Sequence, residues 1–96
     1  MPVRKPKADP LRELIGETIV IDLRSTYVCL GELKEATPDY LVLRNADLHD
    51  LRDTDTTREN YIAASVATGI KRNRKNLWLM RDEIVAVARL SDVVEV

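Results

Sequence analysis

A run of acidic side chains around the only histidine is the first place to look for chemistry in this sequence. Carboxylates and imidazole bind metal ions, and a cysteine beside a histidine can form a nucleophile–base pair. The run lacks the glycine and the closing glutamate of a calcium-binding EF-hand loop, and one histidine is not a zinc site. Its members are Asp47, His49, Asp50, Asp53 and Asp55. Because this spacing matches no metal site, we expect no metal and no cofactor. Cys29 lies inside a predicted strand, where a cysteine is usually inert, so we also expect no enzymatic activity.

Two basic stretches could attract the phosphate backbone of a nucleic acid. The first consists of Arg4, Lys5 and Lys7, within eight residues that hold two prolines, so residues 1–8 are expected to form a flexible arm. The second stretch consists of Lys71, Arg72, Arg74 and Lys75. A simpler interpretation is that the acidic run neutralises the second stretch across a pair of loops. The formal net charge of -1 creates no overall field that favours nucleic acid or membrane.

Length and composition indicate one domain. The chain has 96 residues, and residues 9–96 are expected to form that domain after the arm. One cysteine can build no disulfide framework and fits a reducing compartment. No apolar run approaches the ~18 residues of a membrane span, and the basic start lacks the apolar region of a secretory signal. We therefore expect a cytoplasmic protein without a membrane partner.

Five strands are predicted from alternating apolar and polar residues separated by turns. They cover residues 18–23, 27–35, 40–45, 70–80 and 84–90. Gly31 lies in the middle of the second strand, where a glycine marks a bulge or a sharp bend. A strand must bend strongly to serve both sheets of a small barrel. The pattern therefore predicts a mainly β fold, a small and strongly bent antiparallel barrel of five strands.

Two helices are predicted beside these strands. Asp9 and Pro10 begin a short N-terminal helix, because aspartate caps a helix and proline fits its first turn. The capping box of Thr56 and Glu59 begins a second helix. This helix belongs to an inserted loop and helix at about 46–69, between the third and fourth strands.

The last two strands are apolar on both faces, and such strands need a cover on each side. A second subunit that pairs with exposed strand edges would supply this cover. The two helices could instead cover the same strands within one chain. The residues expected at an interface between subunits are Leu77, Trp78, Leu79, Met80, Val85 and Val87.

The order of these elements resembles the Sm/LSm family. Gly31 to Leu33 is similar to the Gly-x-Leu of the family's first motif, and Tyr40 to Ala46 resembles its third strand. Met80 to Val85 is similar to the second motif, in which an apolar residue and Arg-Gly precede strand five. The resemblance implies an SH3-like barrel of the Sm type in a divergent, bacterial-type member. It also implies a homo-oligomeric ring, in which strand five of one subunit pairs with strand four of the next.

In that family the loops at the pore bind RNA. The resemblance implies that Arg81 contacts bases there by stacking and hydrogen bonding, both of which a guanidinium can do, and Tyr40 could add a stacking face. The expected site consists of Thr37, Asp39, Tyr40, Arg81 and Asp82. Arg81 could instead pair with Asp39, Asp82 or Glu83, and Tyr40 could pack on the barrel rim.

Two departures from the family's motifs bear on RNA. The turn from Ala36 to Tyr40 lacks the aspartate and asparagine of the family's base pocket, and Asp82 replaces a glycine. Aspartate tolerates a left-handed turn, so the fold can survive, but a carboxylate beside a phosphate path is unfavourable. Two functions remain open: a ring that binds single-stranded RNA, and a homo-oligomeric scaffold or protein-interaction module with little RNA affinity. A monomer would point instead to an SH3-like adaptor.

Overall fold

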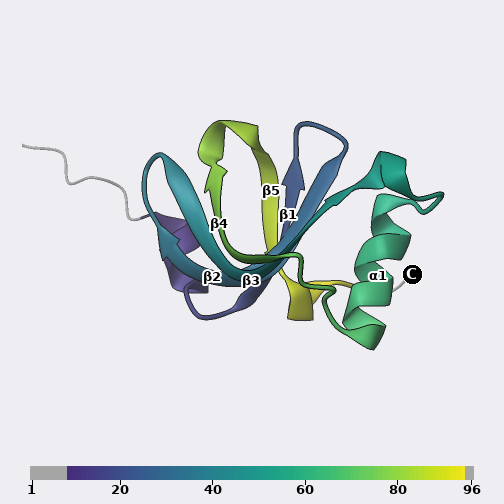
Figure 1. Ribbon diagram of the computed structural model, residues 1–96. Coiled ribbons are helices and arrows are strands. Elements are labelled where there is room, and N and C mark those ends of the chain that lie inside the picture. Colours follow the sequence, from purple (N-terminus) through teal and green to yellow (C-terminus); the bar gives the residue numbers. More distant parts are fainter. Residues whose placement is uncertain (1–8, 95–96) are drawn as a thin grey trace, which may run out of the picture.

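The computed structural model describes residues 9–94 as one strongly bent sheet with a single α-helix beside it (Figure 1). The strands are β1 (Thr18–Leu23), β2 (Tyr27–Ala36), β3 (Tyr40–Asp50), β4 (Arg74–Met80) and β5 (Ile84–Arg89). The helix α1 spans Arg58–Thr68. Four short 3-10 turns are η1 (Pro10–Leu14), η2 (Leu51–Asp53), η3 (Arg81–Glu83) and η4 (Leu90–Asp92). The expected arm, residues 1–8, lies outside the described residues.

All strand neighbours are antiparallel, and the strand order is β4-β3-β2-β1-β5. The mainly β, five-stranded antiparallel prediction is thus confirmed. The chain passes from β4 through η3 into β5, yet these two strands form the opposite edges of the sheet and do not pair. The sheet of the described residues is therefore open, whereas a closed SH3-like barrel was expected.

The bend in β2 coincides with Gly31. A Cβ added to this glycine would lie 3.1 Å from both Cα and Cβ of Ala46 on β3. The register shifts between Leu30 and Glu32, opposite Asn45, whose φ of 51° is left-handed. Between these two pairs β3 has one more residue than β2. An extra residue of this kind is a β-bulge, which bends and twists the strands around it. The glycine therefore permits the close approach of β3 where the sheet folds over.

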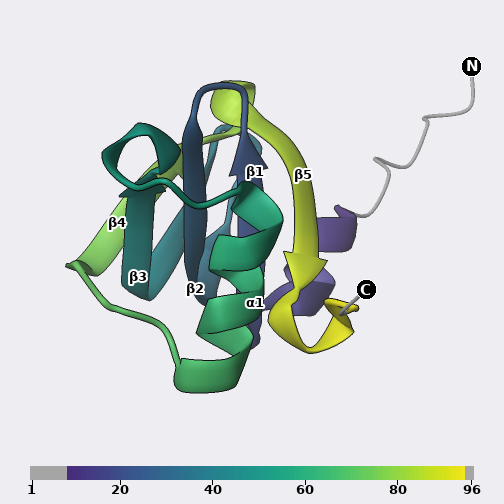
Figure 2. The same cartoon turned by 90° about the vertical axis from the view of Figure 1, so that its right-hand side faces the viewer.

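The two faces of the sheet carry separate apolar clusters. The inner cluster is built around fully buried residues, namely Ile19, Ile21, Cys29, Leu33, Leu41 and Leu43. The outer cluster joins Val20, Val28 and Leu30 to Ile62 of α1. Figure 2 shows α1 lying across β1 and β2. The helix therefore covers the outer face of the central strands and leaves Trp78 on β4 exposed.

Two strand boundaries differ from the sequence prediction by more than one residue. β3 continues to Asp50, five residues beyond the expected end, because its second half pairs with the first half of β2 from Leu30↔Asp47 to Tyr27↔Asp50. The insertion therefore begins after Asp50 and not at Ala46. β4 begins at Arg74 and not at residue 70, since residues 70–73 are the irregular link from α1.

The predicted N-terminal helix is a 3-10 turn, η1. Asp9 caps it as expected, and its carboxylate accepts a hydrogen bond of 3.1 Å from the backbone N–H of Leu11. Leu14 of this turn joins the inner cluster, so η1 closes one end of the core. No helix among residues 9–94 is long and apolar enough to cross a membrane.

Candidate nucleic-acid interface

Turns from distant parts of the sequence meet at one end of the sheet. The backbone N–H of Arg81 in η3 donates to the carbonyl of Asp39 at 3.0 Å, and the backbone N–H of Arg24 donates to the carbonyl of Glu83 at 2.9 Å. Because β2 is so strongly bent, the turns at both of its ends reach η3, along the top in Figure 1. We call residues 37–40 together with η3 the loop end. It brings together all five residues expected at the site.

Arg81 is held by two contacts within the chain. Its Nε donates to the carbonyl oxygen of Thr37 at 2.6 Å. Its Nη2 donates to the carboxylate of Asp9, which lies 72 positions away in the sequence. This hydrogen bond is the main reason why the pKa of Asp9 lies below its usual value. The expected alternative of an ion pair is thus realised with Asp9 and not with Asp39, Asp82 or Glu83. Among residues 9–94, Nη1 of Arg81 makes no hydrogen bond.

Thr37 and Tyr40 shape the turn between β2 and β3. The hydroxyl of Thr37 accepts from the backbone N–H of Tyr40 at 3.0 Å and donates to the carbonyl of Tyr40 at 3.1 Å. Tyr40 is half-buried and lies opposite Met80 of β4. Tyr40 therefore lies at the rim of the sheet, across from the residue that precedes Arg81.

The electrostatic character of the loop end is mixed. Asp39, Asp82 and Glu83 are exposed carboxylates on the two turns. The cations nearby include Arg24 and Arg12, which are exposed, and Arg81, which Asp9 already pairs. The three exposed carboxylates outnumber the two exposed guanidiniums, so this end is a poor attractor for phosphates.

The free edges carry exposed apolar side chains. Trp78 and Met80 on β4 are 56% and 49% exposed, and Val85 on β5 is 66% exposed. Leu79 is buried in the inner cluster, and Leu77 and Val87 pack against that cluster. Of the six residues expected at an interface, Trp78, Met80 and Val85 thus offer free surface, whereas Leu79 belongs to the core because it points inward from β4.

A hollow of about 260 Å³ opens beside β4. It is lined mainly by apolar side chains. Leu23, Tyr27, Leu48, Leu77 and Leu79 belong to or border the inner cluster, and Trp78 and Met80 line the hollow from the edge strand. The hollow exists because no strand of the described chain pairs with the outer edge of β4. The open sheet therefore exposes part of its own core at this edge.

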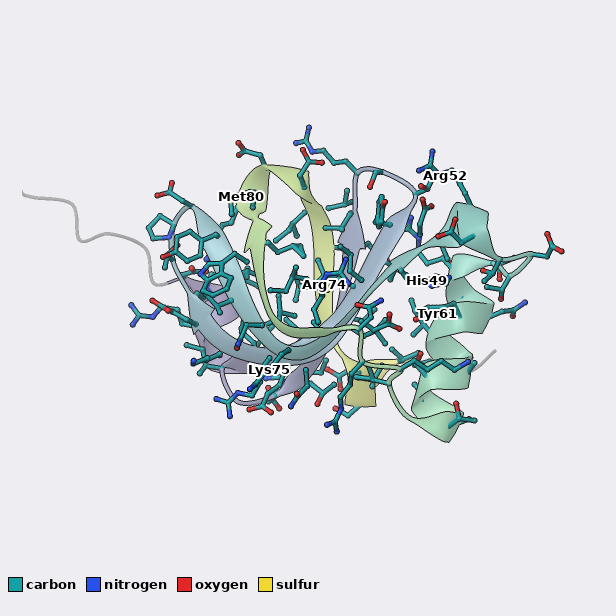
Figure 3. The ribbon with its side chains drawn as sticks, viewed as in Figure 1. His49, Arg52, Tyr61, Arg74, Lys75 and Met80 are labelled. Atoms are coloured by element: carbon teal, nitrogen blue, oxygen red, sulfur yellow. The ribbon has the colours of Figure 1, made fainter. Side chains whose placement is uncertain are left out.

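Within residues 9–94, the second basic stretch forms no salt bridge with the acidic run. Lys71, Arg72, Arg74 and Lys75 are all exposed, and only the charge of Lys71 acts on an acidic residue of the run, Asp47, where it lowers the pKa against the larger effect of burial. Two of the acidic residues are engaged elsewhere. Asp50 pairs with Arg52 at 2.7 Å, and Asp47 accepts a hydrogen bond of 3.1 Å from Asn73. Figure 3 shows Arg74 and Lys75 at the opposite end of β4 from Met80.

The acidic run is dispersed over the fold. The His49 ring stacks on Tyr61 of α1, with centroids 4.0 Å apart, and Figure 3 shows both rings beside the helix. Asp47 is 2% exposed, its Oδ2 has no hydrogen bond among the described residues, and burial raises its pKa. No group of three or more histidine, cysteine or acidic residues in residues 9–94 could hold a metal ion.

The single cysteine is buried in the inner cluster. Burial raises the pKa of the Cys29 thiol to about 12, and the charge of Asp47 adds to the shift. At neutral pH the side chain is therefore a thiol, which is a weak nucleophile.

Sequence reasoning missed two residues that organise these surfaces. Asp9 was recognised as a helix cap, but nothing in the sequence indicated that its carboxylate would pair with Arg81. Asn73 was not singled out, although its side chain fixes the start of β4 to β3. A polar residue between four basic ones was the only signal for it.

Comparison with known proteins identifies the fold. No protein-family model and no curated protein matches this chain. A solved structure that does match is the Pyrococcus abyssii Sm protein in complex with a uridine heptamer, with a TM-score of 0.58 and 13% identity over 85% of this chain and 99% of that one. A heptameric archaeal Sm protein matches with a TM-score of 0.55 and 15% identity over 82% and 93% of the two chains. This chain therefore has the Sm fold.

Proposed function

We propose that this protein is a divergent, bacterial-type Sm-like subunit that assembles into a homo-oligomeric ring and binds single-stranded RNA at the loop end. The observation that carries the proposal is the pair of free sheet edges, β4 and β5, with Trp78, Met80 and Val85 exposed along them. The single buried cysteine fits a cytoplasmic protein.

Pairing β5 of one copy with β4 of the next would remove both edges at once. Unpaired edge strands are templates for pairing with another chain. The contact joins two different surfaces, so it is heterologous, and a heterologous contact that closes by rotation produces a ring. An apolar side chain of the arriving β5 would also fill the hollow beside β4, which completes an SH3-like barrel between neighbours. The likeness to a heptameric Sm protein supports this assembly.

RNA binding is supported by the geometry of the loop end. The half-buried Tyr40 would supply a ring face, and Nη1 of Arg81, which makes no hydrogen bond among residues 9–94, would supply a donor from the neighbouring turn. Stacking of a base on an aromatic ring contributes roughly 1–3 kcal/mol. A ring would repeat this pair in every subunit, so weak contacts would add up along one strand of RNA. The likeness to an Sm protein in complex with a uridine heptamer supports the choice of ligand.

A scaffold with little RNA affinity is the second candidate. It is favoured by the contacts of Arg81 with Asp9 and Thr37, which use the donors that a base would need. The exposed carboxylates of Asp39, Asp82 and Glu83 favour it as well. In this role the ring would present other surfaces to a protein partner.

Two measurements test the proposal. Native mass spectrometry should give a single oligomer, and labelled oligo-U and oligo-A should bind to it at low salt. Arg81→Ala should weaken RNA binding, and Asp82→Asn should strengthen it because a carboxylate is removed beside the phosphate path. A monomeric mass would refute the assembly. A ring that binds neither oligomer at micromolar concentrations, or binds equally well with Arg81→Ala, would instead establish the scaffold.

A further inference from the structure

The second basic stretch and one neighbouring arginine form a surface that the loop end does not include. We call Lys71, Arg72, Arg74, Lys75 and Arg44 the basic segment. All five side chains are exposed, and none forms a salt bridge within residues 9–94. Elsewhere four arginines are paired with acidic residues, namely Arg52, Arg58, Arg81 and Arg89. The basic segment therefore concentrates positive charge on a protein whose net charge is -1.

The backbone of the basic segment is fixed by Asn73. Its backbone N–H donates to the carbonyl of Ala46 at 2.9 Å. Its side chain accepts from the N–H of Leu48 at 3.0 Å and donates to the carbonyl of Leu48 at 2.9 Å, as a further strand residue would. The same amide donates to Asp47 at 3.1 Å. The cations on either side of Asn73 are thus presented from a fixed backbone, which lowers the entropic cost of binding a ligand.

Two residues of the basic segment, Arg44 and Arg72, line a small cleft. It has a volume of about 180 Å³ and is lined by Thr18, Glu32, Arg44, Asn45, Ile70 and Arg72. Glu32 offsets one of the two guanidiniums, so the cleft keeps an excess of one positive charge. Arginine is well suited to bind a phosphate because its planar group can donate two parallel hydrogen bonds.

The basic segment is far from the loop end. Arg74 and Met80 are the first and last residues of β4. Six steps of an extended strand, at about 3.3 Å each, place them roughly 20 Å apart. A ligand that touches both surfaces must therefore be long and flexible.

We propose that the basic segment is a second binding surface for single-stranded RNA, which contacts the phosphate backbone independently of the loop end. The inference rests on the proposed function only in taking RNA as the ligand. A repeating chain of phosphates matches a group of exposed cations, two of which, Arg44 and Arg72, line a cleft with only one apolar residue, Ile70. Such contacts position a strand without reading its bases.

The salt dependence of binding tests this surface. For single strands, the slope of log K against log salt is about -0.7 for each phosphate contacted. Arg72→Gln with Arg74→Gln should therefore reduce the slope by about 1.4 if each arginine contacts one phosphate. Between 50 mM and 200 mM salt this difference corresponds to about a sevenfold smaller loss of affinity. The ligands are the uridine heptamer and an oligo-U several times longer.

The matched control is Arg12→Gln with Lys34→Gln. It removes the same charge from exposed positions on η1 and β2 that form no salt bridge within residues 9–94, and it should leave the slope almost unchanged. Equal slope changes in the two double variants would overturn the inference, since the effect would then come from net charge alone. Competition by a polyglutamate peptide as strong as that by oligo-U at equal charge would also overturn it, because the surface would then fit an acidic protein.

The outcomes separate this inference from the proposed function. If oligo-U binds and the Arg72/Arg74 double variant keeps the wild-type slope, the inference is wrong and the loop end remains the site. If the long oligomer binds through these arginines and Arg81→Ala has no effect, the loop end is wrong and the basic segment stands. Absence of binding by either oligomer refutes both.

Discussion

The assembly can be tested sharply at Val85. This side chain is 66% exposed on the free edge strand β5. Full burial of a valine contributes about 2 kcal/mol, so covering its exposed part at an interface would contribute about 1.3 kcal/mol, close to a factor of ten in association. Val85→Lys would lose this contribution and would also bury an ammonium group, at a cost of several kcal/mol. Natural proteins block strand edges with lysine for the same reason.

Val85→Lys should therefore convert the proposed ring into monomers that stay folded. The measurements are native mass and the emission of Trp78, which is the only tryptophan and lies 56% exposed on β4. Emission should shift to longer wavelength in the variant, because assembly would cover this indole. Val66→Lys on α1 is the matched control, since Val66 is an exposed valine on the helix and not on an edge strand, and the change should leave mass and emission unchanged. A Val85→Lys protein that keeps the oligomeric mass and the emission of wild type would refute pairing through β5.

Three further predictions concern the fold. Gly31→Val should lower the free energy of unfolding by about 1–3 kcal/mol and reduce Tm, because its Cβ would lie 3.1 Å from the Ala46 backbone and the strand could not bend there; an unchanged Tm would contradict this. Asp47→Asn should stabilise the protein at neutral pH but not in acid. Burial raises the pKa of Asp47, so the folded state holds its proton more tightly and loses stability as the pH rises from the unfolded toward the folded pKa; denaturant unfolding at both pH values measures the difference. Cys29 should react with iodoacetamide at neutral pH only after unfolding, since burial raises its pKa to about 12; mass spectrometry would reveal labelling of the native protein, which would refute this placement.

Much of the sheet was predictable because its strands follow simple patterns. β1 was predicted with both ends correct, and β5 to within one residue, since apolar residues recur regularly there and turn residues bound them. β3 was predicted too short because the left-handed Asn45 interrupts its alternation, after which a polar residue, Asp47, is buried. A bulge shifts which side chains face the core, and a sequence read with a fixed period of two cannot show that shift.

The candidate site was predictable in position but not in its contacts. The turns around Tyr40 and Arg81 were expected together, and the structure brings them together. The pairing of Arg81 with Asp9 joins residues 72 positions apart, so local patterns could not indicate it. The prediction that the acidic run would pair with the basic stretch was wrong because it also depended on contacts that local patterns do not indicate. Asp47 turned inward and Asp50 paired with Arg52, so neither forms a salt bridge with the basic residues.

In a complex with RNA, the two ends of β4 would make different contributions to binding. At the loop end Arg81 is already paired and carboxylates surround it, so attraction of phosphates there is weak. At the start of β4 the cations are exposed, without ion pairs among the described residues, and held by Asn73. Affinity from counterion release would therefore arise mainly at the basic segment, and discrimination between bases only at Tyr40 and Arg81. The two surfaces lie roughly 20 Å apart along β4. An RNA too short to span this distance would therefore gain either the electrostatic affinity or the discrimination between bases, but not both.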